Sequence, residues 1–185
     1  EVSAATTIGY SETVKLQSAD INGDGKADLM ALSKSPSSCT SGCSSYIEVS
    51  LGRGDGTFIG HRLIESRNVD NGVLLGASLI DVSGDGKVDL VSGSYAKSVF
   101  GIVTSYVDLY AGKGDGTFEA KKSTELGSGI SKDGVLFDVI DVNNDGNPDL
   151  VYQQTRYDVA VRLGLGDGTF SATAKLSTLP SSAQE

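Results

Sequence analysis

Short apolar segments with a period of two recur along this chain, and they predict β-strands rather than helices. The clearest alternation occurs three times, at Ile47, Val49 and Leu51, at Val107, Leu109 and Ala111, and at Val159, Val161 and Leu163. Such a segment is typical of a strand with one buried face. Because the three triplets stand at the same offset from a following Gly-Asp-Gly turn, we expect them to face one core. The pattern predicts an all-β protein.

The predicted strands are grouped around a nine-residue segment that occurs at residues 20–28, 81–89 and 141–149. An apolar stretch precedes each segment, as at 74–80 and 135–140, and another follows it. The first residues of successive segments are 61 and 60 positions apart, which indicates a repeat architecture. With the alternating strand and one more strand after the Gly-Asp-Gly turn, each unit holds four strands. Four strands are the content of one β-propeller blade.

Each nine-residue segment carries oxygen-bearing side chains at positions 1, 3, 5 and 9 and a glycine at position 6. These oxygens would repel one another unless a cation lay between them. Calcium takes six to eight oxygen ligands, and glycine at position 6 permits the sharp turn around the ion. The pattern therefore predicts three calcium loops. An EF-hand is the alternative, but it requires flanking helices and a glutamate at position 12, where this chain has Ala31, Ser92 and Tyr152.

The formal net charge of −9 excludes a nucleic-acid binder, because no basic patch is available to neutralise phosphates. Nine of the 24 acidic residues are aspartates of the three loops, so much of the acidity is assigned to metal sites. No apolar run approaches the ~18 residues of a membrane-spanning helix, and no signal-peptide pattern is present. The chain begins at Glu1 rather than at methionine, from which we expect a mature or trimmed form.

Cys39 and Cys43 are the only cysteines, and they stand in the sequence Cys-Thr-Ser-Gly-Cys. A zinc site needs about four ligands, and neither a second cysteine pair nor a nearby histidine is present. A disulfide at the tip of a hairpin is the favoured interpretation, and it indicates an oxidising compartment. Together with millimolar calcium outside cells, this favours a secreted or extracellular protein.

A second motif, Gly-Asp-Gly-Thr-Phe, recurs in step with the aspartate loops, within residues 51–58, 111–118 and 163–170. The two alternating motifs resemble the FG-GAP/VCBS repeat, the unit of integrin α-subunit propellers and of many secreted propellers. Together they frame nearly the whole chain. The resemblance implies β-propeller blades with one calcium ion in the hairpin loop between the first two strands of each blade.

Carried over by position, the resemblance implies four side-chain ligands and one backbone carbonyl, at position 7, in each loop. These are Asp20, Asn22, Asp24, Lys26 and Asp28; Asp81, Ser83, Asp85, Lys87 and Asp89; and Asp141, Asn143, Asp145, Asn147 and Asp149. Ser83 departs from the usual Asp or Asn, so the second site is expected to be the weakest or to complete its ligand set with water.

The repeat places an N-terminal strand at residues 1–10, three blades at 11–68, 69–128 and 129–180, and a C-terminal tail at 181–185. Three four-stranded antiparallel sheets leave a propeller ring incomplete, since propellers have four to eight blades. We expect either a fragment of a longer chain or a homo-oligomer that completes the ring. An open monomer is less favoured, because its bare sheet face and edges would promote aggregation.

The expected function is recognition without catalysis. The connections between the second and third strands differ between the units, and variable loops on a constant frame are where binding is expected, of a glycan in a lectin-like role or of an extracellular protein in adhesion. The alternative is a structural or accessory module of a secreted hydrolase or toxin. Arg53-Gly-Asp55 spells an adhesion tripeptide, but Lys113 and Leu165 replace the arginine in the other units, so it is interpreted as a repeat turn. The sequence contains no nucleophile elbow and no phosphate-binding loop.

Overall fold

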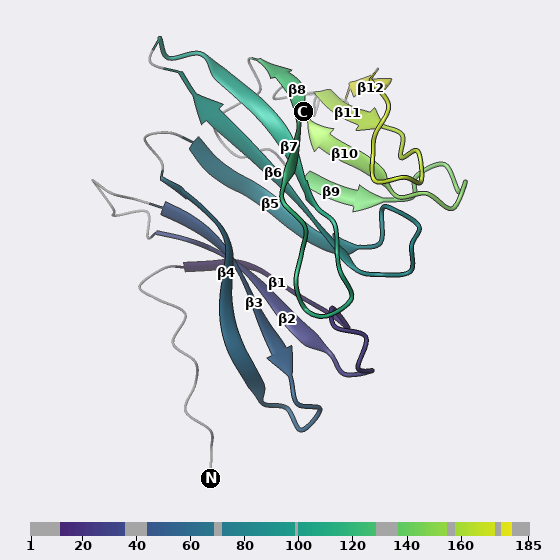
Figure 1. The fold of residues 1–185 in the computed structure, drawn as a ribbon. Coiled ribbons are helices and arrows are strands. Elements are labelled where there is room, and N and C mark those ends of the chain that lie inside the picture. Colours follow the sequence, from purple (N-terminus) through teal and green to yellow (C-terminus); the bar gives the residue numbers. More distant parts are fainter. Residues whose placement is uncertain are drawn as a thin grey trace, which may run out of the picture.

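The chain folds into three four-stranded antiparallel sheets, each built from strands that are consecutive in sequence (Figure 1). The computed structural model describes residues 12–35, 44–68, 72–98, 100–128, 137–154, 158–172 and 175–178. These residues form twelve strands and no helix. The all-β prediction and the prediction of three four-stranded antiparallel sheets are therefore confirmed. The predicted strand at 1–10, the tail at 181–185 and the cysteine pair Cys39 and Cys43 lie outside the described residues.

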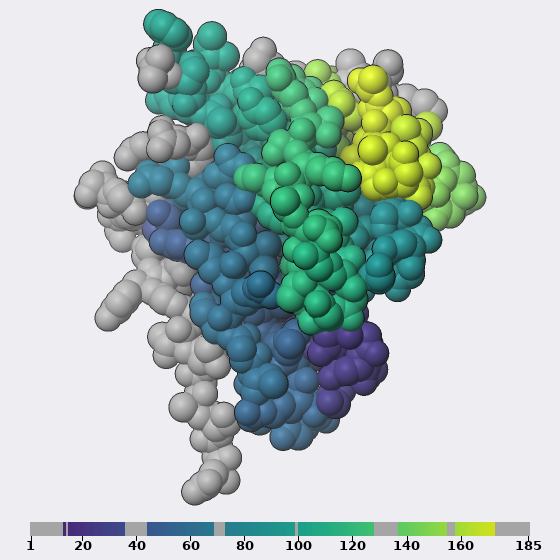
Figure 2. Space-filling view, viewed as in Figure 1, coloured from purple at the N-terminus to yellow at the C-terminus, as the bar shows by residue number. Residues whose placement is uncertain are grey.

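We call the three sheets blades 1, 2 and 3. Blade 1 contains β1 (Glu12–Ala19), β2 (Asp28–Lys34), β3 (Ser44–Gly52) and β4 (Phe58–Asn68). Blade 2 contains β5 (Gly72–Ile80), β6 (Asp89–Lys97), β7 (Val103–Tyr110) and β8 (Lys122–Ser128). Blade 3 contains β9 (Phe137–Ile140), β10 (Asp149–Gln153), β11 (Asp158–Arg162) and β12 (Lys175–Thr178). Blade 2 lies between the other two (Figure 1), and the blades pack against one another in chain order (Figure 2).

Two hydrophobic cores hold the blades together. Ile47 and Val49 of blade 1 pack with Leu79, Leu90 and Tyr110 of blade 2 in the first core. The second core joins blade 2 to blade 3 and includes Val91, Val107, Leu109, Val139, Leu150 and Tyr152. Each blade interface is thus a layer of strand side chains buried between two sheets, as in sheet-on-sheet packing.

The expectation that the three alternating triplets face one core is wrong. Ile47 belongs to the core between blades 1 and 2, and Val107 belongs to the core between blades 2 and 3. Val159 and Val161 belong to neither core and are only half-buried. The physical reason is the geometry of stacked sheets: each triplet faces the blade that follows its own, and among the described residues no blade follows blade 3.

Candidate metal loops and the contacts around them

Each aspartate loop connects the first two strands of a blade, at residues 20–27, 81–88 and 141–148. Glycines at positions 4 and 6 allow the tight turn because they adopt positive φ, as at Gly84 (71°) and Gly86 (81°) in the second loop. The third loop has Asn144 at position 4, with φ of 59°, a conformation that asparagine tolerates better than most residues.

The aspartate at position 1 lies at the centre of its loop and accepts backbone hydrogen bonds from the far side of the turn. Asp20 accepts from the amides of Asp24 at 3.1 Å and Gly25 at 2.8 Å. In the other two loops the short bonds come from positions 4 and 6 instead. Asp81 accepts from the amides of Gly84 and Gly86, and Asp141 accepts from those of Asn144 and Gly146, at 2.7–2.9 Å. These bonds wrap the loop around the carboxylate.

The side chain at position 3 points toward the same place. Asn22 Oδ1 accepts from the Asp24 amide at 3.0 Å, the amide that also donates to Asp20 Oδ1. Two oxygens that share one donor lie close together. In the third loop Asn143 and Asp141 converge in the same way on the Asp145 amide. In the second loop, Ser83 Oγ donates to Asp81 Oδ1 at 3.3 Å instead.

The aspartate at position 5 is exposed and stays ionised. The backbone amide of the residue at position 7 donates to Asp24, Asp85 and Asp145 at 2.8–2.9 Å. This bond is the main cause that lowers the pKa of each of these carboxyls. In the first two loops the ammonium of Lys26 or Lys87 also contacts the carboxylate, at 3.1 Å.

The aspartate at position 9 has a different place, at the base of the loop. Asp28, Asp89 and Asp149 are fully buried. Asp89 accepts from the amides of Val82 at 3.0 Å and Ser83 at 3.1 Å, and its other oxygen accepts from the amide of Gly112 at 2.8 Å. Asp28 and Asp149 make the same link, to the start of their own loop and to Gly52 or Gly164. Position 9 therefore ties the loop to the end of the third strand.

The glycine at the end of this link permits a very close approach. A Cβ atom at Gly52, Gly112 or Gly164 would lie 2.0–2.1 Å from the carbonyl oxygen of the residue at position 8. Only glycine fits there. From the sequence we predicted this glycine only as part of the turn motif, and its contact was missed. The available signal was its fixed offset in all three units, two positions before the Gly-Asp-Gly turn.

The donor set at positions 1, 3 and 5 fits a hard cation, since its oxygens are carboxylate, amide or hydroxyl and converge within one loop. No group of three or more His, Cys, Asp or Glu side chains that could hold a metal occurs among the described residues. The reason is that position 3 is Asn or Ser and that the position 9 carboxylates are directed to backbone amides. An ionised carboxylate has about four lone-pair sites, so the two amides at Asp28 and Asp149, or the three at Asp89, do not occupy all of them. The ligand role of position 9 stays a prediction.

The Gly-Asp-Gly-Thr-Phe turns are held by their own side chains. Asp55 accepts from the backbone amide of Thr57 at 2.9 Å and from its hydroxyl at 2.7 Å. The hydroxyl bond is the main cause that lowers the pKa of Asp55. Asp115 and Asp167 make the same pair of bonds with their threonines. Asp55 of the Arg-Gly-Asp tripeptide therefore has the same turn-forming role as Asp115 and Asp167 in the other two units.

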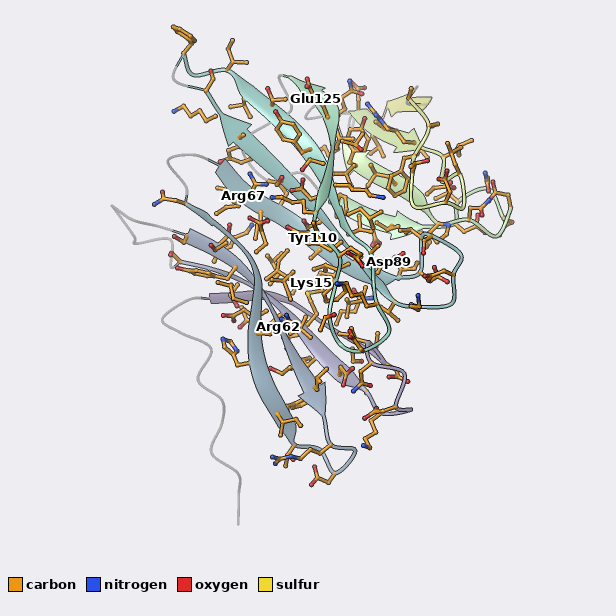
Figure 3. The ribbon with its side chains drawn as sticks, in the orientation of Figure 1. Lys15, Arg62, Arg67, Asp89, Tyr110 and Glu125 are labelled. Carbon is orange, nitrogen blue, oxygen red and sulfur yellow. The ribbon has the colours of Figure 1, made fainter. Side chains whose placement is uncertain are left out.

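A network of charged side chains joins blade 1 to blade 2 and was not predicted from the sequence. Arg67 of β4 donates to the fully buried Asp108 of β7 at 3.0 Å. Asp108 also accepts from the hydroxyls of Ser94 and Ser123. Figure 3 shows Arg67 and Tyr110 at the boundary between the two blades. Arg67 and Asp108 are 41 residues apart in sequence, and no local sequence pattern predicts that they pair.

Glu65 completes this network beside Arg67. It accepts from Lys121 at 2.7 Å and from the Tyr110 hydroxyl. Burial raises the pKa of Glu65, but the hydrogen bonds from Lys121 and Tyr110 outweigh it and hold the pKa below its usual value. Burial, followed by the contact with Glu65, raises the pKa of Tyr110. These side chains line a cavity of about 370 Å³ between β4 and the segment that follows β7.

The β6–β7 hairpin exposes two apolar side chains. Its tip is closed by the Ser98 amide, which donates to the Ile102 carbonyl at 2.8 Å, and by the Gly101 amide, which donates to the Ser98 carbonyl at 2.9 Å. Phe100 is 88 % exposed and Ile102 is 56 % exposed. Two apolar side chains of this hairpin are therefore in contact with solvent rather than packed in a core.

Comparisons with known proteins bear on the repeat itself. A family model described as an FG-GAP-like repeat matches residues 20–92 and residues 81–152, which together are more than two thirds of the chain. No curated protein and no solved structure matches it. Within the described residues, no helix is long and apolar enough to span a membrane.

Proposed function

Because this chain belongs to the family of FG-GAP-like repeat proteins, we propose that it is a calcium-stabilised recognition module without catalytic activity. It acts as part of a secreted or cell-surface protein. Its repeat supplies a frame of propeller blades, and its hairpin tips bind a glycan or another extracellular protein. The observation that carries the proposal is the exposed Phe100 in the β6–β7 hairpin.

The hairpin position supports recognition because it varies while the frame repeats. In each blade a hairpin connects the second and third strands, and these connections differ in length and sequence. Aromatic side chains are favoured at binding surfaces since they contribute a large contact area at low entropic cost. The cavity beside Glu65 and Tyr110 is a second place where a ligand could contact two blades.

We propose that calcium has a structural role, stabilising the loop between the first two strands of each blade, and takes no part in a reaction. When bound, the ion supplies positive charge to the clustered oxygens of a loop. The residues that would hold it are the side chains at positions 1, 3 and 5 and the carbonyl at position 7: Asp20, Asn22, Asp24 and Lys26; Asp81, Ser83, Asp85 and Lys87; and Asp141, Asn143, Asp145 and Asn147. The bonds from Asp20 to the Asp24 and Gly25 amides pre-form the loop for this ion.

The recognition proposal is tested by applying the calcium-loaded protein to a glycan array and to a panel of extracellular proteins. We expect reproducible binding that Phe100→Ala reduces at least tenfold. Ile59→Ala is the matched control, because Ile59 is also exposed, at 43 %, but lies on β4 of blade 1 and does not line the cavity beside Glu65 and Tyr110. Silence on both panels, or equal binding by the Phe100→Ala variant and the native protein, would contradict a recognition role for this tip and favour the accessory-module alternative.

A further inference from the structure

The exposure of the residue at position 2 of each aspartate loop depends on whether another blade packs against that loop. Ile21 is 1 % exposed and Val82 is 4 % exposed, because blades 2 and 3 cover them. Val142 occupies the same place in blade 3 and is 48 % exposed. The repeat keeps an apolar residue at a position that only a following blade would bury.

The rest of the outer face of blade 3 follows the same rule. Ile80 packs against the core between blades 2 and 3, whereas the equivalent Ile140 is 52 % exposed. Val107 is 3 % exposed, whereas the equivalent Val159 is only half-buried. Val161, equivalent to the buried Leu109, is half-buried too. We call Ile140, Val142, Val159 and Val161 the outer face of blade 3.

The equivalent faces of blades 1 and 2 are both covered within this chain, by blade 2 and blade 3 respectively. Each time the covering surface is the preceding side of the next blade, with the Gly-Asp-Gly turn of that blade seated on the aspartate loop. The Gly168 amide of blade 3 donates to the Val82 carbonyl of blade 2 at 3.0 Å. A Cβ atom at Gly116 of blade 2 would lie 3.1 Å from Leu51 and 3.6 Å from Asn22, both in blade 1.

Blade 1 carries the matching side without an occupant among the described residues. Leu16 is 58 % exposed, whereas its equivalent in blade 2, Ala77, is fully buried. A Cβ atom at Gly56, the equivalent of Gly116, would meet nothing within 4 Å. In blade 2, Asp108 accepts a hydrogen bond from Arg67 of the preceding blade. Glu48 occupies the equivalent position in blade 1, and Oε2 of Glu48 is buried without a hydrogen-bond partner. We call this surface the free side of blade 1.

The third aspartate loop has room for an incoming turn. A Cβ atom at Gly23 or Gly84 would lie 3.6 or 3.2 Å from the carbonyl oxygen of the next blade's turn glycine. The equivalent Asn144 has the same left-handed conformation. Its Cβ would therefore be in contact with a docked turn, and its amide group could donate to the turn carbonyl.

We propose that the outer face of blade 3 binds the free side of blade 1 of a second copy of this chain, head to tail. The contact would repeat the two interfaces already present inside the chain. It is heterologous, since different surfaces of the two copies meet. Two copies joined in this way supply six blades, within the range of four to eight that closes a propeller. The inference depends on neither calcium nor the Phe100 tip.

The test measures molecular mass in solution by light scattering for the full chain. The variants are Val142→Lys on the outer face, Leu16→Lys on the free side, and Leu165→Lys as the control. Leu165 is exposed, at 58 %, but lies in the turn that faces blade 2, and blade 2 itself carries lysine at the equivalent position, Lys113. All substituted positions are exposed, so circular dichroism should show that each variant folds.

We expect the native protein and Leu165→Lys to have twice the monomer mass, and Val142→Lys and Leu16→Lys each to be monomeric. An equal mixture of the two monomeric variants should recover a species of twice the monomer mass, because one chain keeps an intact outer face and the other an intact free side. A monomeric native protein overturns the proposal. So does a dimer that Leu16→Lys leaves intact, which would indicate that two blade 3 faces pack against each other.

Discussion

Two aspartates four residues apart in the same loop have opposite environments. Asp89, whose position is labelled in Figure 3, is fully buried, and its two oxygens accept hydrogen bonds from three backbone amides. The side chain of Asp85 is 43 % exposed, and its partners are the amide and ammonium of Lys87. The repeat therefore uses one residue type in two ways: position 9 belongs to the fold, and position 5 is available to an ion.

The largest expected effect comes from removing the buried carboxylate. Asp89→Ala should lower the free energy of unfolding by about 3–5 kcal/mol. It leaves two buried amides and one partly buried amide unpaired, and each buried loss costs about 1–3 kcal/mol. Urea denaturation checks this. Added calcium should not restore the loss. A variant as stable as the native protein would show that position 9 is not part of the fold.

The close approach at the other end of this link gives the next effect. Gly112→Ala should cost about 1–3 kcal/mol or more, since its Cβ would lie 2.1 Å from the Val88 carbonyl and the strands would have to separate. The control is Gly101→Ala, at φ of 79° with nothing near its Cβ, which introduces backbone strain alone, about 1–2 kcal/mol. Denaturation midpoints that fall further for Gly101→Ala than for Gly112→Ala would contradict the close contact.

Glu65 is less buried than Asp89 and less exposed than Asp85, and its ionisation makes the stability of the protein depend on pH. Its pKa is lower in the folded state than its usual 4.5. Its contribution is therefore fully present above about pH 4.5 and is lost as the pH falls through the folded-state value. Melting temperature measured from pH 6 downward should decline less steeply for Glu65→Gln than for the native protein. Equal slopes would mean that Glu65 is not stabilised as an anion by its contacts.

The smallest effect is expected at the exposed carboxylate. Asp85→Asn should leave the melting temperature in EDTA unchanged, because Asp85 is exposed and its contact with Lys87 is a surface ion pair. The same variant should show a smaller gain in melting temperature than the native protein when calcium is added. A large loss of stability in EDTA would remove the distinction between positions 5 and 9.

Local patterns in the sequence predicted the units of this fold but not the contacts between them. The alternation at Ile47 and Val49 and the recurring Gly-Asp-Gly turns were sufficient for three four-stranded sheets, because strand period and turn chemistry are local properties. The pairing of Arg67 with Asp108 depends on how two sheets pack, which no short segment encodes. The ligand role of position 9 was predicted from its fixed place in three copies of the loop and from the family resemblance. Neither source reveals that its carboxylate is buried against the Gly112 amide.

We propose that positions 1, 3 and 5 of the three aspartate loops bind calcium, while the buried aspartate at position 9 stabilises the fold. Calcium binding to the chelator-treated native chain, measured by isothermal titration calorimetry beside the triple variant Asp24→Asn, Asp85→Asn, Asp145→Asn, tests it most directly. We predict three ions per native chain, a rise in melting temperature on binding, and loss of both in the variant, which should still fold. Absence of calcium binding by the native chain, with the same melting temperature in EDTA and in calcium, would contradict the account.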